Sequence, residues 1–317
     1  MDTIGIVFPG QGSQYVGMGK DLCEGFHEAK EIFDRAGDAL NIDIARLCFE
    51  GPRDALDLTP NTQAAVLTVD VALYRVFKSV IGIEPSILAG HSLGEFAALC
   101  AAGALDFSDA VRLVYARGEY QQEAVPPGHG CMAAVIGLPR QPVDDICRTV
   151  DRRYGVVEVA NINCPGQFVI SGATTAVEQA MTKAHEKGAR MVVKLSISVP
   201  CHCSLLNTAA ERLNRYLDSV AIGQCEIPVI PNFDPDLLHE KDTTRKLLIQ
   251  QFASPVRWQE TVERMSRMGV RTIVEIGPKK TLTALIKRID KDIKTLNIED
   301  KTSLEATANF FDGGEAA

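Results

Sequence analysis

The sequence has no run of 18 or more apolar residues, so it predicts no membrane-spanning helix. Its start also lacks the basic and then apolar segments of a secretory signal peptide, and we therefore expect a cytoplasmic protein. Basic residues are outnumbered, with 33 lysines and arginines against 41 aspartates and glutamates, which gives a net charge of −8. This balance argues against nucleic acid as a partner, although it is compatible with a local basic patch.

Patterns for metals and nucleotide cofactors are missing as well. The nine cysteines are scattered and contain no C-x-x-C pair, which indicates reduced thiols. Cys201 and Cys203 flank His202, but three consecutive residues cannot easily converge on one ion, so no metal site is expected. The glycine-rich loop at 9–14 departs from a dinucleotide-binding loop because Tyr15 stands where a small residue is needed. Such a loop can instead lend a backbone N–H to an oxyanion hole.

The 317 residues are 46% apolar and 23% charged, a composition typical of a globular protein with a sizeable core. Segments 3–8, 85–90 and 271–277 resemble short buried strands, and helical patterns separate them. Segment 130–197 follows the order strand, helix, strand, strand, helix, strand, which is the ferredoxin-like order.

These patterns predict an α/β protein in which a small domain is inserted into a larger one. We assign residues 1–127 and 198–299 to a discontinuous catalytic domain and residues 128–197 to the insert. Residues 300–317 are small, polar and acidic, and we expect a flexible tail there.

The stretch Gly90-His91-Ser92-Leu93-Gly94 contains the pattern G-x-S-x-G between a predicted strand and a predicted helix. A nucleophile elbow requires this context, because its strained turn tolerates only small residues two positions before and after the serine. The backbone N–H of Leu93, at the start of the helix, could then donate to an oxyanion. The alternative is a tight turn with an incidental serine.

A serine nucleophile needs a general base, most often a histidine. His91 is unsuitable because neighbours in a sharp turn point apart. We expect three of the other histidines to be exposed to solvent: His27, His185 and His239. His129, at the glycine-rich junction, could have either role. His202 lies at the tip of a predicted strand-to-helix loop, where it could face a cleft or be a hydrogen-bonded structural residue.

The predicted helix at 107–124 places a cation on its apolar side. At 100° per residue, Arg117 falls between Leu113 and Ala110, whereas Arg112 lies opposite them. A guanidinium there must pair with a buried acid or face a ligand cavity. Helical geometry leaves both open.

Together these segments resemble the malonyl-CoA:acyl carrier protein transacylases and the related acyltransferase domains of polyketide and fatty acid synthases. The matching segments span nearly the whole chain in the expected order and leave only the tail uncovered. They are VFPGQGSQYVGMG (7–19), NTQAAV (61–66), GHSLGEFAAL (90–99), ARGEYQQEA (116–124), NINCPGQFVISG (161–172), VPCHCSLL (199–206), FASPVRW (252–258) and VEIGP (274–278).

The resemblance implies an α/β-hydrolase-like large domain with a ferredoxin-like insert, and a ping-pong acyl transfer. Ser92 would attack the thioester of malonyl-CoA with His202 as general base, and the backbone N–H groups of Gln11 and Leu93 would hold the oxyanion. The malonyl group would then pass to the phosphopantetheine thiol of acyl carrier protein. Coenzyme A enters as a substrate thioester, so no cofactor is expected.

The same resemblance implies how substrate and base are held. Arg117 would bind the free malonyl carboxylate, with Gln63 close by. A backbone carbonyl near Gln251, rather than a carboxylate, would orient the base. Asn161 and Asn163 would have supporting roles near it.

Two positions depart from the family pattern. Cys201 replaces a common serine before the histidine and borders the α-substituent of the acyl group in polyketide relatives. Lys279 replaces a frequent glycine in a loop expected to be exposed, where it would affect partner contact.

Carrier proteins are acidic, so docking needs a basic patch. The candidates are Lys279, Lys280, Lys287, Arg288 and Lys291.

Alternatives of other classes remain open at this point. The same nucleophile could serve an editing acyl hydrolase, a trans-acting polyketide acyltransferase with another carboxyacyl substrate, or a docking subunit that has kept the fold. The presence of Ser92, His202 and Arg117 argues against the last. We expect a monomer.

Overall fold

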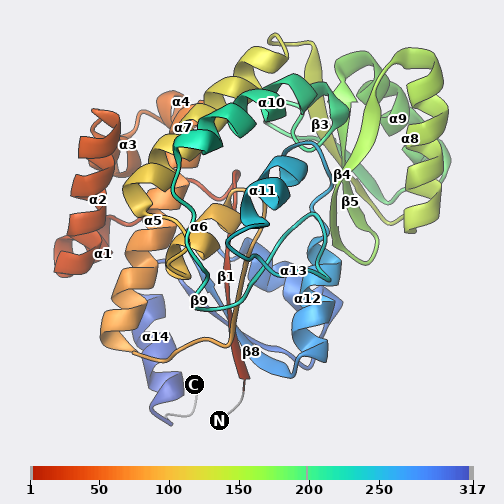
Figure 1. Ribbon diagram of the computed structural model, residues 1–317. Coiled ribbons are helices and arrows are strands. Elements are labelled where there is room, and N and C mark those ends of the chain that lie inside the picture. The colour runs from red at the N-terminus through yellow and green to blue at the C-terminus, as the bar shows by residue number, and fades with distance from the viewer. Residues whose placement is uncertain (1–2, 198, 314–317) are drawn as a thin grey trace.

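The computed structural model describes residues 3–197 and 199–313, and its strands form two separate sheets (Figure 1). The strands are β1 (Thr3–Phe8), β2 (Ile87–Gly90), β3 (Gly130–Ile136), β4 (Val157–Cys164), β5 (Gln167–Ala173), β6 (Met191–Lys194), β7 (Val229–Ile230), β8 (Val270–Ile276) and β9 (Lys294–Ile298). The helices before β3 are α1 (Lys20–Gly25), α2 (His27–Leu40), α3 (Ile44–Glu50), α4 (Arg53–Leu56), α5 (Thr59–Val80), α6 (Gly94–Ala101) and α7 (Phe107–Ala124). The later ones are α8 (Arg140–Tyr154), α9 (Thr174–Glu186), η1 (Ser204–Leu206), α10 (Asn207–Tyr216), η2 (Leu217–Ser219), α11 (Thr244–Phe252), α12 (Trp258–Arg267), α13 (Thr281–Ile289) and α14 (Lys301–Phe311).

The larger sheet is parallel, with the order β7-β2-β1-β8-β9 and β1 at its centre. Its strands are apolar because helices cover both faces. In β1, Ile6 and Phe8 face a core shared with α5, α6 and α7, whereas Val7 faces a second core shared with α12 and α13. Because β1 and β2 are parallel neighbours, their carboxyl ends meet at one edge of the sheet, where ligands of open α/β sheets bind.

The smaller sheet is antiparallel, with the order β4-β5-β3-β6, which is the ferredoxin-like arrangement. Helices α8 and α9 cover one face and enclose a separate apolar core (Figure 1). The opposite face carries Met132, Ala134 and Val169 towards a cleft described below. The predicted fold class, a large α/β domain with a ferredoxin-like insert, is confirmed.

The insert begins with β3 at Gly130 and its last strand ends at Lys194. The domain boundary that we predicted at residue 198 lies outside the described residues. Within the described residues, no helix is both long enough and apolar enough to cross a membrane.

The prediction of a flexible tail over residues 300–317 is wrong for its first part. Asp300 accepts a hydrogen bond from the Ser303 N–H and caps α14, which packs on β9. Leu304, Thr307 and Phe311 form the packed side of this helix at a spacing of three and four residues. The small polar composition concealed this stripe. Residues 314–317 lie outside the described residues.

One buried acid in α5 has no partner. Both carboxylate oxygens of Asp70 are without a hydrogen bond in the described chain, and the side chain is fully buried. Oδ1 lies against Gly277, where an added Cβ would come within 2.4 Å of it. Burial, and secondarily the Glu275 carboxylate, raises the pKa of Asp70 well above its ordinary value. The native protein therefore favours the protonated acid.

We predict that Asp70→Asn makes the protein more stable relative to wild type as the pH rises. Because the native pKa of Asp70 is raised, the native state binds a proton that the unfolded chain releases above about pH 3.9, and wild-type stability falls with pH until the native pKa is passed. Over that interval the gap in unfolding free energy widens by about 1.4 kcal/mol per pH unit. Urea unfolding from pH 4 to 9 measures it, with the exposed Asp54→Asn as control. A gap that stays constant with pH contradicts the prediction.

Candidate active site

The serine turn lies where β2 ends and α6 begins. Ser92 has a φ of 53°, in the left-handed region that residues with a side chain rarely adopt. A Cβ added to Gly90 would lie 1.9 Å from the carbonyl carbon of Gly94, and one added to Gly94 would lie 2.1 Å from the carbonyl oxygen of Phe8. Backbone contacts therefore require both glycines, and the turn has the geometry of a nucleophile elbow.

His202 is the histidine that meets Ser92. Its Nε2 lies 2.7 Å from Ser92 Oγ, and its Nδ1 lies 2.9 Å from the carbonyl oxygen of Gln251 and 3.2 Å from that of Ser254. A carbonyl oxygen can only accept, so Nδ1 carries the proton and the Nε2 lone pair faces the serine hydroxyl. This arrangement suits a general base oriented by backbone carbonyls.

The imidazole of His202 is held in its neutral form. Burial, and then the positive charge of Arg117, lowers the pKa of His202 to about 3. The two carbonyl acceptors oppose this shift but do not outweigh it. His202 is thus ready to accept a proton throughout the neutral and mildly acidic range.

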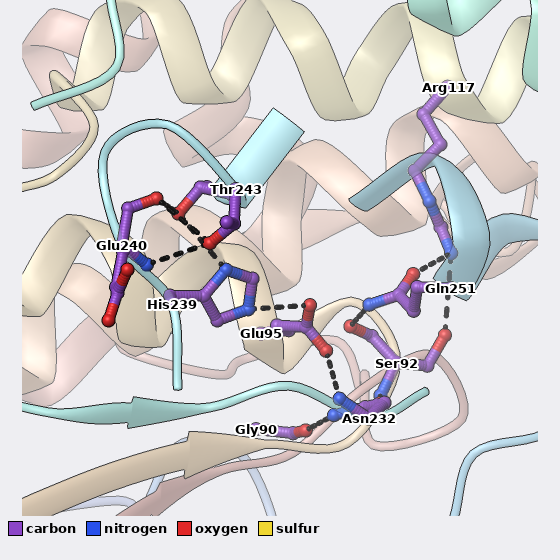
Figure 2. A network of polar contacts seen from close by, with 10 residues as sticks. Gly90, Ser92, Glu95, Arg117, Asn232, His239, Glu240, Thr243 and Gln251 are labelled. Carbon is purple, nitrogen blue, oxygen red and sulfur yellow. Dashed lines mark hydrogen bonds and ion pairs between the residues drawn. The ribbon is translucent and has the colours of Figure 1, made fainter. Parts of the chain in front are cut away.

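Arg117 extends from α7 into the same site and is 2% exposed (Figure 2). Its Nη1 donates to Gln63 Oε1 at 2.8 Å, and its Nη2 donates to Gln251 Oε1 at 3.3 Å and lies 3.5 Å from Ser92 Oγ. Two aromatic rings lie within 5.6 Å of the guanidinium carbon: Phe96 and Phe252. The helical phase had left two alternatives, and this position selects the one in which the cation faces a cavity.

No carboxylate forms an ion pair with Arg117 in the described part of the chain, and its Nε has no hydrogen-bond partner there. Burial lowers the pKa of Arg117 to about 10, so the side chain remains cationic at neutral pH. A buried cation whose neighbours are neutral amides has unused capacity to bind an anion.

Gln63 lies behind the guanidinium. It is fully buried in α5, and its Nε2 donates to Gln121 Oε1 at 2.6 Å while its Oε1 accepts from Arg117. Its visible effect is to fix the position of the guanidinium. Gln251 has more contacts than its carbonyl alone, because its Nε2 also donates to the Ser92 carbonyl at 2.9 Å.

The first loop lies against the elbow at Gly10. A Cβ added to Gly10 would come within 2.4 Å of the His91 carbonyl oxygen and 3.6 Å of the Leu93 nitrogen. In the described chain, the backbone N–H groups of Gln11 and Leu93 donate to no protein acceptor. Leu93 also precedes the first residue of α6, where the helix dipole favours negative charge. Both groups are thus available to an oxyanion.

Asn161 and Asn163 lie on β4 and line the cleft beside the nucleophile. Asn163 Oδ1 lies 3.0 Å from Nε2 of His91, so it holds the histidine that the turn directs away from the nucleophile. The structure gives Asn161 no side-chain hydrogen bond, and its position in the cleft is its only visible link to the site.

One cleft of about 420 Å³ between the two domains is lined by Ser92, Arg117, His202, Asn161 and Asn163. The large domain contributes the first loop, Ser92, Arg117, His202 and Leu285 of α13. The inserted domain contributes the open face of its sheet. A long, partly apolar acyl donor could enter between them while its reacting carbon meets Ser92.

Of the two departures from the family pattern, Cys201 lines this cleft and Lys279 contacts the loop that lines it. Cys201 lies beside the base, and burial raises the pKa of its thiol to about 11, so it is a neutral wall. Lys279 is only half-buried, and its Nζ donates to the Gly12 carbonyl at 2.9 Å. It therefore braces the first loop, which sequence reasoning had not anticipated.

Sequence reasoning missed a second group of buried residues, which lies under the elbow (Figure 2). Asn232 binds the Gly90 carbonyl and the Ser92 N–H, and Glu95 and His239 lie behind it. The prediction that His239 is exposed to solvent is wrong, since it is 2% exposed. Its loop looked polar, and only the tertiary contact with Glu95 buries it.

Among residues 3–197 and 199–313, no cluster of three or more His, Cys, Asp or Glu side chains could hold a metal ion. This site is suited to acyl transfer through a serine ester. Ser92 and His202 can transfer a proton, Arg117 can bind an anion, and the backbone N–H groups of Gln11 and Leu93 can stabilise an oxyanion.

Comparisons with known proteins agree with this chemistry. Residues 6–308 match the family model described as acyl transferase domain. The chain is 44% identical over 305 residues to the malonyl CoA-acyl carrier protein transacylase of Bacillus subtilis (strain 168), covering 96% of each. It also superimposes on the malonyl CoA-acyl carrier protein transacylase of Coxiella burnetii, with a TM-score of 0.94, 41% identity and 97% of each chain covered. A structure of a holo type II PKS acyl-carrier protein in complex with its malonyl-transacylase gives a TM-score of 0.95 at 40% identity, covering 97% of this chain and 99% of that one.

We predict that the rate at which a fluorophosphonate probe labels Ser92 changes less than about twofold between pH 5 and 8. His202 stays neutral over this range because its pKa is lowered to about 3, whereas an ordinary histidine would lose about tenfold per pH unit below 6.5. Labelling is followed by intact mass, with His202→Ala as the control for base-independent reaction. A fall in rate with a midpoint near pH 6.5 would show that His202 is not held neutral.

Proposed function

The chain belongs to the acyl transferase domain family, and from this premise we propose that it transfers a malonyl group from malonyl-CoA to the phosphopantetheine thiol of an acyl carrier protein. The observation that carries the proposal is the buried Arg117, which has no carboxylate partner and lies 3.5 Å from the hydroxyl of Ser92. Relatives named malonyl CoA-acyl carrier protein transacylases over nearly the whole chain support the same substrate and partner.

In the first half-reaction, Ser92 Oγ attacks the thioester carbonyl and His202 Nε2 takes the hydroxyl proton. The charge that develops on the carbonyl oxygen is met by the backbone N–H groups of Gln11 and Leu93. The tetrahedral intermediate collapses, the carbon–sulfur bond breaks, and the coenzyme A thiolate takes the proton back from His202. A malonyl-serine ester remains.

The second half-reaction reverses these roles. The phosphopantetheine thiol gives its proton to His202 and attacks the ester carbonyl. Collapse breaks the bond to Ser92 Oγ, and His202 returns the proton to that oxygen. In the first half-reaction the coenzyme A thiolate is a good leaving group, so a histidine oriented by carbonyls rather than by a carboxylate meets the demand. In the second half-reaction the leaving group is the oxygen of Ser92, which leaves as the hydroxyl because His202 protonates it.

Arg117 selects the acyl group in this proposal. Gln63 and Gln251 hold the guanidinium from the side and leave it a face towards the cleft, where a malonyl carboxylate can form charge-assisted hydrogen bonds. An acetyl group leaves the buried cation unpaired. Asn161 and Asn163 are assigned supporting roles at the wall of the cleft.

The acyl carrier protein reaches Ser92 from the mouth of the cleft, which α13 borders. The basic residues predicted for docking lie on this helix or within two residues of its ends, and Arg288 contacts the Pro165 carbonyl of the inserted domain. The solved complex between a malonyl-transacylase and its carrier protein supports a partner of this kind.

We also assign the reaction to the cytoplasm, because all nine cysteines are free thiols, as a reducing compartment would keep them.

We predict that brief incubation with malonyl-CoA adds one malonyl group to Ser92 and that holo acyl carrier protein then removes it. Intact mass spectrometry measures both proteins, with methylmalonyl-CoA and acetyl-CoA in parallel and Ser92→Ala as control. An adduct that persists in Ser92→Ala refutes the nucleophile. An adduct that decays to free malonate at the same rate with and without carrier protein identifies a hydrolase instead.

We predict that Arg117→Ala lowers kcat/KM for malonyl-CoA by about 10- to 150-fold and reduces the preference for malonyl-CoA over acetyl-CoA by at least tenfold. The substitution removes the charge-assisted hydrogen bonds to the carboxylate, and a contact of this class contributes about 1.5–3 kcal/mol, or 10- to 150-fold. Initial rates of acyl-serine formation measure the ratio. The exposed Arg112→Ala in the same helix is the matched control, and an unchanged ratio in Arg117→Ala would make Arg117 a structural residue.

A further inference from the structure

The strained turn at Ser92 is held by an asparagine from a distant part of the chain. Asn232 follows β7 and is fully buried. Its Oδ1 accepts from the Ser92 N–H at 2.6 Å, and its Nδ2 donates to the Gly90 carbonyl at 2.5 Å (Figure 2). One side-chain amide thus bridges the last residue of β2 and the nucleophile.

Both contacts need an amide. The Ser92 N–H requires an acceptor and the Gly90 carbonyl requires a donor, and an amide supplies one of each from adjacent atoms. The Gly90 carbonyl cannot turn to water, since Gly90 and Asn232 are buried. A left-handed backbone at a residue with a side chain persists only when its surroundings fix it, and this bridge fixes the N-terminal side of Ser92.

Asn232 is itself anchored by an acid and a histidine. Its backbone N–H donates to Glu95 Oε2 at 2.7 Å, and Glu95 Oε1 lies 3.0 Å from Nε2 of His239. His239 Nδ1 lies 3.2 Å from the hydroxyl of Thr244 on α11. The Glu95 and His239 side chains have no exposed surface, and neither lines the cleft. Glu95 also lies on α6, so its hydrogen bond joins the helix that follows the nucleophile to the loop that carries Asn232.

We propose that Asn232 is a positioning residue for Ser92, anchored by Glu95 and His239, and that it aims Oγ at His202 while presenting the Leu93 N–H to the oxyanion. The inference rests on the proposed function only in taking Ser92 as the nucleophile. In this proposal Asn232 affects the rate of the chemical step and not the affinity for the acyl donor, because Asn232 does not line the cleft.

The variants Asn232→Ala and Asn232→Asp test the proposal. Asn232→Ala removes both contacts, and a misplacement of about 1 Å at a reacting group costs about 10²-fold in rate. Asn232→Asp keeps the shape. Its protonated carboxyl can both accept from Ser92 and donate to Gly90, whereas its ionised form can only accept and repels the Gly90 carbonyl.

The neighbours of position 232 should shift the pKa of an aspartate there towards the pH range of the experiment. Burial and the Glu95 carboxylate of α6 both raise the pKa of an aspartate there above its ordinary value of about 3.9. His239 faces Glu95 rather than Asn232. Just before α12, the Arg257 N–H donates to the Asn232 carbonyl, and the Arg257 side chain pairs with Asp234 and Glu260. The rate of Asn232→Asp should therefore rise as the pH falls from 8 to 5, while that of wild type stays flat.

The experiment measures Ser92 labelling by a fluorophosphonate probe and single-turnover acylation by malonyl-CoA at pH 5 to 8. The exposed Asn309→Asp is the matched control, and circular dichroism establishes that each variant is folded at each pH. We expect Asn232→Ala to be about 10²-fold slower in both assays with an unchanged Kd for malonyl-CoA. We expect Asn232→Asp to regain at least tenfold of the loss between pH 8 and 5.

A rate for Asn232→Ala equal to that of wild type would overturn the proposal, as would a pH profile of a folded Asn232→Asp that runs parallel to wild type. Failure of both variants to fold would also overturn it, because the fold itself would then require the residue. If wild type is labelled by the fluorophosphonate but not acylated by malonyl-CoA, the proposed function fails while the labelling rates still decide the role of Asn232.

Discussion

The left-handed backbone of Ser92 exists because three glycines let separate chain segments come into backbone contact. Gly90 and Gly94 close the turn against itself and against β1, and Gly10 brings the first loop onto it. One constraint therefore produces several features of the site at once. The serine hydroxyl points out of the sheet, the Leu93 N–H stands free at the start of α6, and the loop with Gln11 lies beside it.

A strained turn of this kind costs about 1–3 kcal/mol and must be held from outside. Side-chain amides hold it on both sides, since Asn232 binds the N–H of Ser92 and Gln251 binds its carbonyl. Gln251 also orients His202 through its backbone and Arg117 through its side chain. The nucleophile, the base and the cation thus share one supporting residue, so their relative positions are set together.

The sequence alone predicts the parts of this arrangement that depend on local pattern. The strand, the helix and the two glycines point to Ser92, whereas the phase of Arg117 on an apolar helix shows only that it pairs with a buried acid or faces a cavity. For His202 the sequence left two roles open, a base facing a cleft or a structural residue, because no local pattern shows what a loop residue faces. Only the family resemblance favoured the base. Asn232 and Glu95 could not be found this way, since their contact joins residues 137 positions apart. In the same way, the helix α14 was missed because its apolar stripe is three residues long and set among small polar ones.

The buried cation links substrate choice to the chemistry of the base. Arg117 helps to lower the pKa of His202, and no carboxylate in the described chain forms an ion pair with Arg117. In the proposed reaction, a malonyl carboxylate on Arg117 neutralises that charge, so the imidazole becomes more basic once the correct acyl group is bound. The substrate then supplies the negative charge that a buried aspartate supplies in other serine enzymes. An acetyl group leaves the charge of Arg117 uncompensated, and it is therefore disfavoured in the proton transfer as well as in binding.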